Sequence, residues 1–576
     1  MSHTVQIEVN SRQVDAAPGE MLLSALRRVG IEVPTLCNFE GLSPAGACRI
    51  CVVEVEGQRS LVPACAFPVT AGMKVKTQSD RVVDARRMIV ELLLADHPDD
   101  CLFCERNENC QLRELAATYG IRKRRFVGQR STYPVDSSGE SIVRDAEKCI
   151  KCGKCVRVCD EIQGVACISF INRGSQTTVG TAFDEGMNVS SCINCGQCTA
   201  ACPTGALVAK SHIERVMAAL RNPDLHVVVQ HAPAVSVTLG EELGFSPGVD
   251  MMGKMHALLR RMGFDSVFDT SYSADLTIME EATELIQRIK HGGVLPMFSS
   301  CSPGWIKFVE TFYPQNIPNL STCKSPQQML GAVIKSHYAE KKGLDPKNIF
   351  SVSIMPCTAK KFEASRPEMG RNGYQDIDAV LTTRELAQMV RRFNLDLNVE
   401  PEAADSPFGI RSSAGKIFGA TGGVMEAAVR SAYYFMTGTE LGNLEVEAVR
   451  GLAGIKEAHV EIARIKVGVA VVNGLGNARK LLDQINAGAR KDIHFVEVMT
   501  CPGGCVGGGG QPYGTDTGKV KVRTQELYNI DGTGTLRVSH ANPEIKQIYE
   551  EFLEAPNSHK AHELLHTHYQ QRETLM

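Results

Sequence analysis

The cysteines of this 576-residue chain are distributed very unevenly along the sequence. Sixteen of the 21 lie between Cys37 and Cys202, and the other five are widely spaced behind them. We find no N-terminal signal pattern, and a large chain without one is a poor candidate for a disulfide scaffold. Clustered thiols in a reducing compartment instead indicate metal sites, so their spacings decide what each part of the chain can fold into.

The remaining composition is typical of an ordinary folded protein, with 43% hydrophobic residues, 22% charged residues and a net charge of −3. The length exceeds what one hydrophobic core serves, so we expect several domains. No basic excess indicates a nucleic-acid partner, and no apolar stretch of about eighteen residues indicates a membrane span. We therefore expect a cytoplasmic protein.

Residues 1–80 have the pattern of a β-grasp, ferredoxin-like domain. "TVQIEVN" and "RQVDAA" resemble strands on either side of a turn, and "GEMLLSALRRVG" carries a helical apolar stripe. Four cysteines follow with the spacing C-x10-C-x2-C-x13-C, namely Cys37, Cys48, Cys51 and Cys65. Four thiolates suit a [2Fe–2S] cluster, although the first gap is longer than in plant-type ferredoxins, and zinc is the alternative. The ferredoxin-like start favours the cluster.

Residues 81–125 contain a second set of metal-ligating side chains, in "HPDDCLFCERNENC". These are His97, Cys101, Cys104 and Cys110. Taken alone, one histidine and three cysteines suit tetrahedral zinc. Because the segment lies between other cluster sites, we favour a His-ligated [4Fe–4S] cluster. Imidazole is neutral where thiolate is anionic, so this cluster should be easier to reduce than a four-thiolate one.

Residues 126–212 contain the run C-x2-C-x2-C-x3-C twice, and the second run ends in Pro203. This is the pattern of bacterial two-cluster ferredoxins, in which the fourth cysteine of each run binds the other cluster. We expect one [4Fe–4S] cluster on Cys149, Cys152, Cys155 and Cys202, and another on Cys192, Cys195, Cys198 and Cys159. Cys167 is left over and is interpreted as a packing residue. Four clusters form an electron wire, which must end at a site that uses electrons.

Residues 213–518 are predicted to form an α/β block, so the expected fold is multidomain, combining α+β and α/β parts. Strand-like runs such as "HVVVQHAP" and "NIFSVSIMPC" alternate with helical runs such as "MEEATELIQRIK". No G-x-G-x-x-G motif of a flavin or dinucleotide site follows a strand. The sparse cysteines end apolar runs in "FSSCSPGW", "MPCTAKK" and "EVMTCPGGCVGGGGQP". Strand ends are where α/β folds build sites, so we expect these loops to converge on a cluster.

These three loops resemble the three signatures of the [FeFe]-hydrogenases, TSCCPxW, MPCxxKxxE and ExMxCxxGCxxGGGQP. They stand at residues 299–305, 355–363 and 497–512, and the resemblance spans the whole chain. It implies an enzyme that interconverts two protons, two electrons and H₂ at an H-cluster. That cofactor joins a [4Fe–4S] cube to a diiron unit with CO, CN⁻ and azadithiolate. Cys357, Cys501 and Cys505 match ligands of the cube, and Cys505 also matches the thiolate that holds the diiron unit.

The resemblance also implies roles for further residues. Lys360 matches the residue that hydrogen-bonds a cyanide, and the pocket is expected to be lined by Pro233, Gln327, Met355, Phe418 and Met499. A proton relay is expected through Cys301, Glu281, Ser321, Glu284 and Arg288. Three of these fall at i, i+3 and i+7 of one helix, a pattern that by itself fits an ordinary surface ion pair. Glycines 507–510 are expected to let the backbone approach the cluster closely, the alternative being a flexible loop.

Ser302 departs from the family pattern, because the second cysteine of TSCCP is the fourth ligand of the cube. Cys301 occupies the proton-donor position. Three interpretations stay open: Ser302 binds iron through oxygen, Cys301 becomes the ligand at the expense of the relay, or the site is impaired. Cys323 is nearby in sequence, which cannot place it on the cube. We still expect the cluster to assemble.

Residues 1–210 resemble the N-terminal part of the large iron–sulfur subunit of respiratory complex I, whose neighbour is a flavoprotein. The implied partners are ferredoxin, a flavin-bearing NAD(P)H dehydrogenase-like subunit, or both. An NAD(P)-linked or electron-bifurcating multi-subunit enzyme is the first alternative, and an H₂ sensor or electron-transfer protein with an impaired site is the second. Residues 519–576 resemble the family's helical small subunit. "HELLH" at 562–566 matches a zinc-protease motif, but an amphipathic helix with Leu564 and Leu565 inward is favoured.

Overall fold

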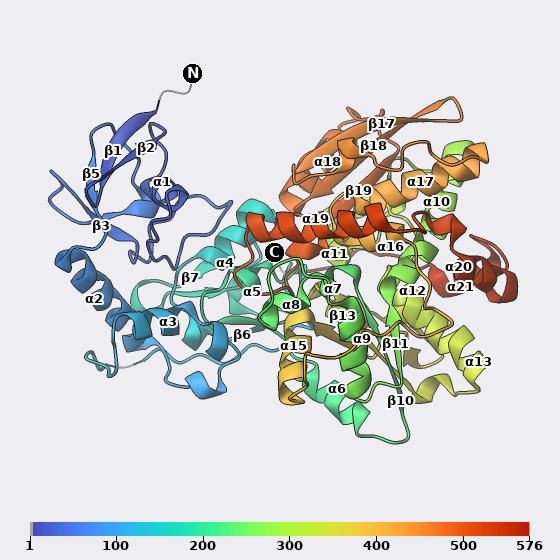
Figure 1. Ribbon diagram of the computed structural model, residues 1–576, viewed down its shortest axis with the longest axis horizontal. Coiled ribbons are helices and arrows are strands. Elements are labelled where there is room, and N and C mark those ends of the chain that lie inside the picture. Colours follow the sequence, from blue (N-terminus) through green and yellow to red (C-terminus); the bar gives the residue numbers. More distant parts are fainter. Residues whose placement is uncertain (1–3, 129, 575–576) are drawn as a thin grey trace.

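The computed structural model describes residues 4–128 and 130–574. It is a multidomain, mixed α/β protein (Figure 1). A small N-terminal domain, drawn in dark blue, connects through a cysteine-rich middle region to a large α/β block. The five C-terminal helical segments, in red, pack on that block rather than forming a separate body.

The N-terminal domain is one five-stranded sheet with a helix packed on it. Its sheet has the order β2-β1-β5-β3-β4, in which β1 pairs antiparallel with β2 and parallel with β5. The helix packs because Leu22, Leu23 and Leu26 are buried on one side, as the apolar stripe predicted. The elements are β1 (Val5–Val9), β2 (Arg12–Ala16), α1 (Leu22–Arg28), β3 (Val52–Val55), β4 (Val62–Pro63) and β5 (Lys74–Lys76).

The middle region has little regular structure, because its loops wrap around cysteines. Helices α4 and α5 both begin directly after a glycine with positive φ, Gly153 at 72° and Gly196 at 70°. Each glycine follows a cysteine of one run, so the sequence repeat is also a structural repeat. The elements are α2 (Asp80–Asp96), α3 (Gln111–Thr118), β6 (Ile142–Arg144), α4 (Lys154–Arg157), β7 (Ser169–Ile171), β8 (Thr178–Gly180), α5 (Gln197–Ala201) and β9 (Leu207–Ala209).

Two four-stranded sheets form the centre of the α/β block. One has the order β11-β10-β13-β16 with every pair parallel, and the other has the order β12-β19-β18-β17, in which only β17 is antiparallel. The inner strands β13 and β18 are mostly apolar and are buried over most of their length, as is typical of strands covered on both faces. Their bounds are β10 (His226–His231), β11 (Ser266–Asp269), β12 (Met297–Phe298), β13 (Ile349–Met355), β16 (Ala379–Thr382), β17 (Ile455–Ile462), β18 (Ile465–Asn473) and β19 (Phe495–Met499).

Helices surround both sheets, and the longest, α10 (Thr270–His291), runs through the block with most of its length buried. It packs against α12, α16 and α17. A short hairpin of β14 (Gly370–Arg371) and β15 (Tyr374–Gln375) completes the block. The other helices are α6 (Ile213–Leu220), α7 (Pro233–Ser236), α8 (Leu239–Glu242), α9 (Met252–Arg261), α11 (Pro303–Phe312), α12 (Pro326–Val333), α13 (Ala339–Lys342), α14 (Ala359–Ala364), α15 (Thr383–Arg392), α16 (Ser413–Lys416), α17 (Gly423–Thr437) and α18 (Leu475–Asn486).

The C-terminal segment consists of α19 (Thr517–Thr533), α20 (Pro543–Ile548) and α21 (His559–Leu565). Figure 1 shows α19 lying across the block, while α21 packs against α12 and α20 against α10. Leu564 and Leu565 are buried, as the amphipathic interpretation of this helix predicted. Among the helices of residues 4–128 and 130–574, none combines the length and the apolar character needed to cross a membrane.

Candidate active site

A cavity of about 90 Å³ lies where strands of both sheets end. β10 leads to Pro233, β13 to Cys357, and β12 and β19 to the loops that hold Ser302 and Cys501. The three cysteine loops therefore converge at one place, as expected from their positions at strand ends. Every pocket and cluster residue that the sequence assigned to this site lines the cavity: Pro233, Cys301, Ser302, Gln327, Met355, Cys357, Lys360, Phe418, Met499, Cys501 and Cys505.

The donor chemistry of the cavity fits an iron–sulfur cofactor. Three thiols, those of Cys357, Cys501 and Cys505, face a space otherwise lined mainly by apolar side chains. Burial raises the pKa of each thiol, and that of Cys505 to about 12. Without a bound metal, each of these sulfurs would therefore keep its proton at neutral pH. Bound iron would replace those protons, because a metal requires the thiolate form.

Ser302 faces the same cavity, but its hydroxyl already has a partner. Its Oγ lies 2.8 Å from Oγ1 of Thr500, and it accepts a longer bond from the Thr500 amide at 3.4 Å. The contact with Thr500 was not predicted from the sequence, because no motif links position 500 to position 302. Trp305, on the following helix, is fully buried against Phe298 and Phe308, which fixes this loop.

Lys360 is held by a carboxylate that the sequence analysis left without a role. Its Nζ donates to Glu363 at 2.9 and 3.1 Å and to the Cys301 carbonyl at 3.2 Å. The Gln327 amide donates to Glu363 at 3.0 Å and to the Lys360 carbonyl at 3.3 Å. The i, i+3 spacing of lysine and glutamate on one helix was the signal that could have indicated the pair.

The five predicted relay residues form a continuous series from the cavity toward the surface. Cys301 faces Glu281, and Glu281 lies beside the Ser321 hydroxyl. Ser321 donates to Glu284 at 3.0 Å, and Arg288 donates to the other Glu284 oxygen at 2.6 Å. Within the described residues, neither carboxylate oxygen of Glu281 has a hydrogen-bond partner of standard geometry. The order of these side chains allows protons to pass from one to the next.

Glu281 has the electrostatic environment of a proton-transfer group. Burial, reinforced by the nearby Glu284 carboxylate, raises its pKa to about 8. A carboxyl group with such a pKa can both accept and release a proton near neutral pH.

Cys323 does not line the cavity. Its Sγ lies 3.8 Å from Glu284 Oε2. The sequence could not place this cysteine, and the structure puts it beside the relay.

The glycines of the loop 507–510 pack closely on the backbone of neighbouring loops. A Cβ on Gly507 would meet the Pro502 carbonyl at 2.3 Å, one on Gly508 the Pro356 carbonyl at 2.2 Å, and one on Gly509 the Cys195 carbonyl at 2.3 Å. Gly508 lines the cavity, but its missing side chain makes room for protein backbone. These glycines let three cysteine loops pack against one another.

The N-terminal cysteine set also comes together in the fold. The thiol of Cys37 lies near those of Cys48 and Cys65, and the thiol of Cys65 also lies near that of Cys51. Four thiols gathered in this way fit a [2Fe–2S] cluster, although zinc would accept the same donors.

The four predicted ligands around His97 are less completely buried than the N-terminal cysteine set. His97 is the C-cap of α2, its Nδ1 bonds the Pro98 carbonyl at 3.0 Å, and its Nε2 is buried with no hydrogen-bond partner in the described part of the chain. A buried ring nitrogen without a partner is expected of a metal ligand. Cys104 and Cys110 lie near each other, while Cys101 is exposed.

The paired runs cross over as the ferredoxin pattern predicted. Cys202, from the second run, shares one small cavity with Cys149, Cys152 and Cys155. In the same way Cys159, from the first run, lies beside three thiols of the second, Cys192, Cys195 and Cys198. Cys167 packs against the hydrophobic core of this region, and its sulfur lies 3.6 Å from that of Cys159.

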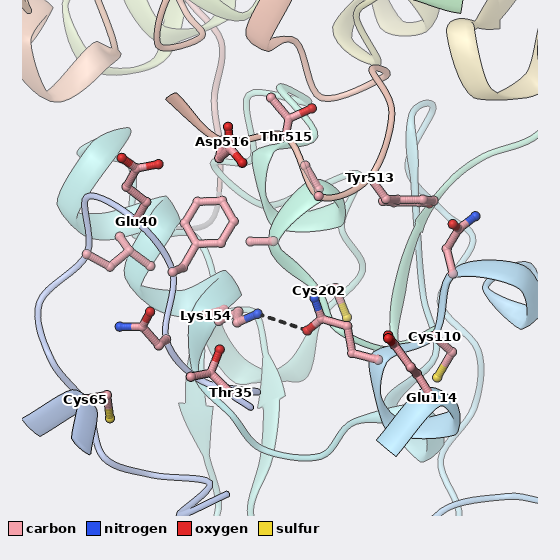
Figure 2. Close-up of a pocket in the computed structure, with 18 of the residues that line it drawn as sticks. Thr35, Glu40, Cys65, Cys110, Glu114, Lys154, Cys202, Tyr513, Thr515 and Asp516 are labelled. Atoms are coloured by element: carbon pink, nitrogen blue, oxygen red, sulfur yellow. Dashed lines mark hydrogen bonds between the residues drawn. The ribbon is translucent and has the colours of Figure 1, made fainter. Parts of the chain in front are cut away.

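A groove of about 1330 Å³ opens between the cluster-binding regions (Figure 2). Cys65, Cys110 and Cys202 line it, and each belongs to a different predicted ligand set. Lys154 crosses part of the groove and donates to Gln111 at 3.4 Å. Three of the four predicted accessory ligand sets therefore border one groove.

Fold and site define an iron–sulfur oxidoreductase with a buried catalytic cavity. Comparison with protein families matches five descriptions: a 2Fe-2S iron-sulfur cluster binding domain (2–80), an NADH-ubiquinone oxidoreductase-G iron-sulfur binding region (86–125), a 4Fe-4S dicluster domain (148–208), the iron only hydrogenase large subunit, C-terminal domain (225–509), and the iron hydrogenase small subunit (517–572).

Whole-length relatives agree with these matches. The chain is 48% identical to NADP-reducing hydrogenase subunit HndD of Solidesulfovibrio fructosivorans, covering 99% of both chains. It is 44% identical to Iron hydrogenase 1 of Clostridium pasteurianum, covering 98% of this chain and 99% of the other. A solved variant of the apo [FeFe]-hydrogenase HydA1 from Chlamydomonas reinhardtii is 44% identical with a TM-score of 0.58, covering 64% of this chain and all of that one. The chain belongs to the [FeFe]-hydrogenases and is an H₂ oxidoreductase.

Proposed function

We propose that hydrogen turnover takes place in the cavity between the two sheets, with Cys357, Cys501 and Cys505 holding an H-cluster. When bound, that group supplies the chemistry that forms and splits H₂. The observation that carries the proposal is the convergence of three thiols, a lysine and a proton relay on one cavity. Cys505 would hold both parts of the cofactor, as its match in the family does.

The chain's own residues position the cofactor and exclude water. Lys360, fixed by Glu363, presents an ammonium group to the cavity, where it can hydrogen-bond a cyanide. Pro233, Met355, Phe418 and Met499 supply apolar walls. A dry, apolar site strengthens each hydrogen bond that remains in it.

The proton relay connects this cavity with the surface of the block. Cys301 holds a proton on sulfur beside the cavity, and Glu281 exchanges it with Ser321 and Glu284. Arg288 neutralises Glu284 at the outer end through the 2.6 Å ion pair. This series supports the role of Cys301 as proton donor, so that Ser302 is the position left for the fourth ligand of the cube.

Electrons arrive through one [2Fe–2S] and three accessory [4Fe–4S] clusters on the four ligand sets between Cys37 and Cys202. Cys195 lines the catalytic cavity together with Cys501. We therefore place the cluster of Cys192, Cys195, Cys198 and Cys159 last in the electron path. The groove of Figure 2 supports contact among the earlier sites.

The chain is proposed to work in the cytoplasm with partner subunits, including a flavin-bearing NAD(P)H dehydrogenase-like protein. This rests on the full-length similarity to a relative named as a subunit of an NADP-reducing hydrogenase. A second candidate is a stand-alone enzyme coupled to ferredoxin, supported by the equally complete match to a relative named only as an iron hydrogenase. Purification of the native complex distinguishes them, because only the first retains an FMN-binding subunit.

The test of the active site is infrared spectroscopy of the matured protein and of Cys505→Ala. The matured protein should show bands of metal-bound CO and CN⁻. Cys505→Ala should lose those bands, because the matching thiolate is the protein's link to the diiron unit, and should keep the accessory clusters as a control. Normal turnover by Cys505→Ala would refute the assignment.

A further inference from the structure

A second group of metal-ligating side chains lies outside the catalytic cavity, beside the relay. Glu284, Cys323 and His566 each offer one ligand atom, and these atoms lie within 4.8 Å of one another. All three residues are buried, with exposed fractions of 8%, 0% and 7%. They come from α10, from the loop that follows Ser321, and from the end of α21.

The backbone fixes these segments to one another. Cys323 and His566 form an isolated antiparallel bridge. The Lys324 amide donates to the Leu565 carbonyl at 2.7 Å, and the Thr567 amide donates to the Thr322 carbonyl at 2.8 Å. The cysteine and the histidine are therefore held side by side by main-chain bonds, and their distance does not depend on flexible side chains.

The two carboxylate oxygens of Glu284 have different neighbours. Oε1 pairs with Arg288 at 2.6 Å. Oε2 points the other way, 3.0 Å from the Ser321 hydroxyl and 3.8 Å from Cys323 Sγ. Among the residues that the structure describes, Oε2 makes no ion pair, but it also accepts from the Thr322 main-chain amide at 3.1 Å, so a cation at this oxygen would compete with that amide and with Ser321.

His566 is oriented as a metal-binding histidine is. Its Nε2 lies 3.1 Å from the buried carboxylate of Glu280, which also accepts from the Asn557 amide at 2.7 Å. With a neutral ring whose Nε2–H donates to Glu280, the lone pair of Nδ1 points toward Thr322 and Glu284. A carboxylate behind the second ring nitrogen is the usual support of a histidine ligand.

The hydroxyl of Thr322 lies between the two acceptors, 2.8 Å from His566 Nδ1 and 3.3 Å from Glu284 Oε2. It has one hydrogen and cannot donate to both at once. A cation among Nδ1, Oε2 and the Cys323 sulfur would satisfy all three. The exposed ring of His562 lies against that of His566, with the ring centres 4.0 Å apart and the planes tilted by 33°.

We propose that Glu284, Cys323 and His566 form a Zn²⁺ site that closes the proton relay when it is occupied. One thiolate, one imidazole and one carboxylate with a fourth position for water are a typical zinc ligand set. The cation would take the lone pair of Oε2 that now accepts from Ser321, so the step between Ser321 and Glu284 stops. This consequence rests on the relay role proposed for Glu284.

The proposed zinc site is not the H-E-x-x-H motif at residues 562–566 of the chain. Only His566 of that motif belongs to the cluster, and the other ligands come from residues more than two hundred positions earlier. Hydrolysis of peptides is therefore not part of this inference.

The binding test uses the matured enzyme with all clusters loaded, to which less than one equivalent of Zn²⁺ is added. X-ray absorption at the zinc edge should show one sulfur at about 2.3 Å with nitrogen and oxygen completing the shell. Cys323→Ala and His566→Gln should each weaken zinc binding at least tenfold. His559→Gln, an exposed histidine on the same helix, is the matched control and should bind zinc like the wild type.

The functional test measures H₂ turnover with and without the same zinc. Turnover should fall in the wild type and in His559→Gln, and it should be unaffected by zinc in Cys323→Ala. The infrared bands of the H-cluster should not change, because the zinc lies outside the cavity. Since Cys323 and His566 belong to different segments, each variant tests the site by itself.

Zinc with several sulfur neighbours, or equal affinity in all variants, would show adventitious binding to cluster cysteines and overturn the site. One-sulfur zinc without slower turnover would overturn the closing of the relay. Glu284→Gln without zinc examines the relay separately. Normal turnover in that variant would refute the role of Glu284, whatever the zinc result.

Discussion

To bind iron, the oxygen of Ser302 must give up its hydroxyl proton, and in its bond with Thr500 it can then only accept. A serine hydroxyl is also hardly acidic, so losing its proton to iron is costlier than for a thiol. We predict that Ser302→Cys raises the iron content of the catalytic cube and the turnover rate, and that it changes the spectrum of the cube. Iron analysis and electron paramagnetic resonance measure both.

The companion variant is Cys301→Ala, which separates the two roles considered for that thiol. A surviving cube with collapsed turnover identifies a proton donor, and a lost cube identifies a ligand. If Ser302→Cys alters neither occupancy nor spectrum, position 302 is not at the cube.

Glu281 should control both turnover and the pH dependence of stability. Its pKa is about 8 in the fold and 4.5 in the unfolded chain, so the folded protein binds more protons between these values. The stability that this contributes is complete below the lower pKa and is lost as pH rises through about 8. Glu281→Gln cannot titrate, so its unfolding should depend less on pH across that window.

The same variant should slow H₂ turnover on the order of 100-fold, because an amide has the shape of the carboxyl group but cannot accept or release a proton at ordinary pH. Infrared bands should stay in place, which makes them the internal control. An unchanged rate would mean that protons travel by another route.

At the scale of elements, helix α11 is held by a buried carboxylate. Glu310 is fully buried and accepts from Arg366 at 3.0 Å, from Arg572 at 2.8 Å and from the Gln570 amide at 3.3 Å. It therefore ties the C-terminal segment to the helix that follows Ser302.

Glu310→Ala should destabilise the protein by about 3–5 kcal/mol, because it leaves the buried Arg366 without its main partner. Denaturant unfolding followed by circular dichroism measures the change. Glu551→Ala, which removes an exposed partner of Lys341, is the control and should have little effect. Similar losses in both variants would contradict the burial argument.

Local patterns predicted the elements well, since they depend on residues close in sequence. The strands around 5–16, the helix with Glu281 and Glu284, and the crossed cysteine runs all follow from spacing alone. Contacts between distant segments were beyond such patterns. Nothing near position 302 indicates Thr500, nothing near Cys323 indicates His566, and the glycines of 507–510 meet backbone from loops that the sequence could not bring there.

At the scale of the molecule, the proposed electron path begins at the cysteines of the N-terminal domain and ends at the set that contains Cys195. The set around His97 lies along this path, and its unpartnered Nε2 is the feature that favours a bound metal. Replacing a neutral imidazole by a thiolate adds negative charge to such a cluster.

We predict that His97→Cys makes this one cluster harder to reduce, while the cluster of Cys149, Cys152, Cys155 and Cys202 keeps its potential. Redox titration followed by electron paramagnetic resonance measures both clusters in one sample. Zinc in place of iron at the His97 set of the wild type would remove that cluster from the path.

The packing of Gly509 on the turn at Cys195 and Gly196 also limits how such proteins can be recombined. Gly196 has no room for a Cβ beside Thr358, Gly509 has none beside the Cys195 carbonyl, and Thr358 donates to the Asn194 carbonyl at 2.7 Å. The ferredoxin-like region and the α/β block therefore fit as a matched pair of surfaces. A chimera that takes one of these two regions from a distant relative should therefore keep both glycines. Without them, the two surfaces would not fit together and the wall of the catalytic cavity would be displaced.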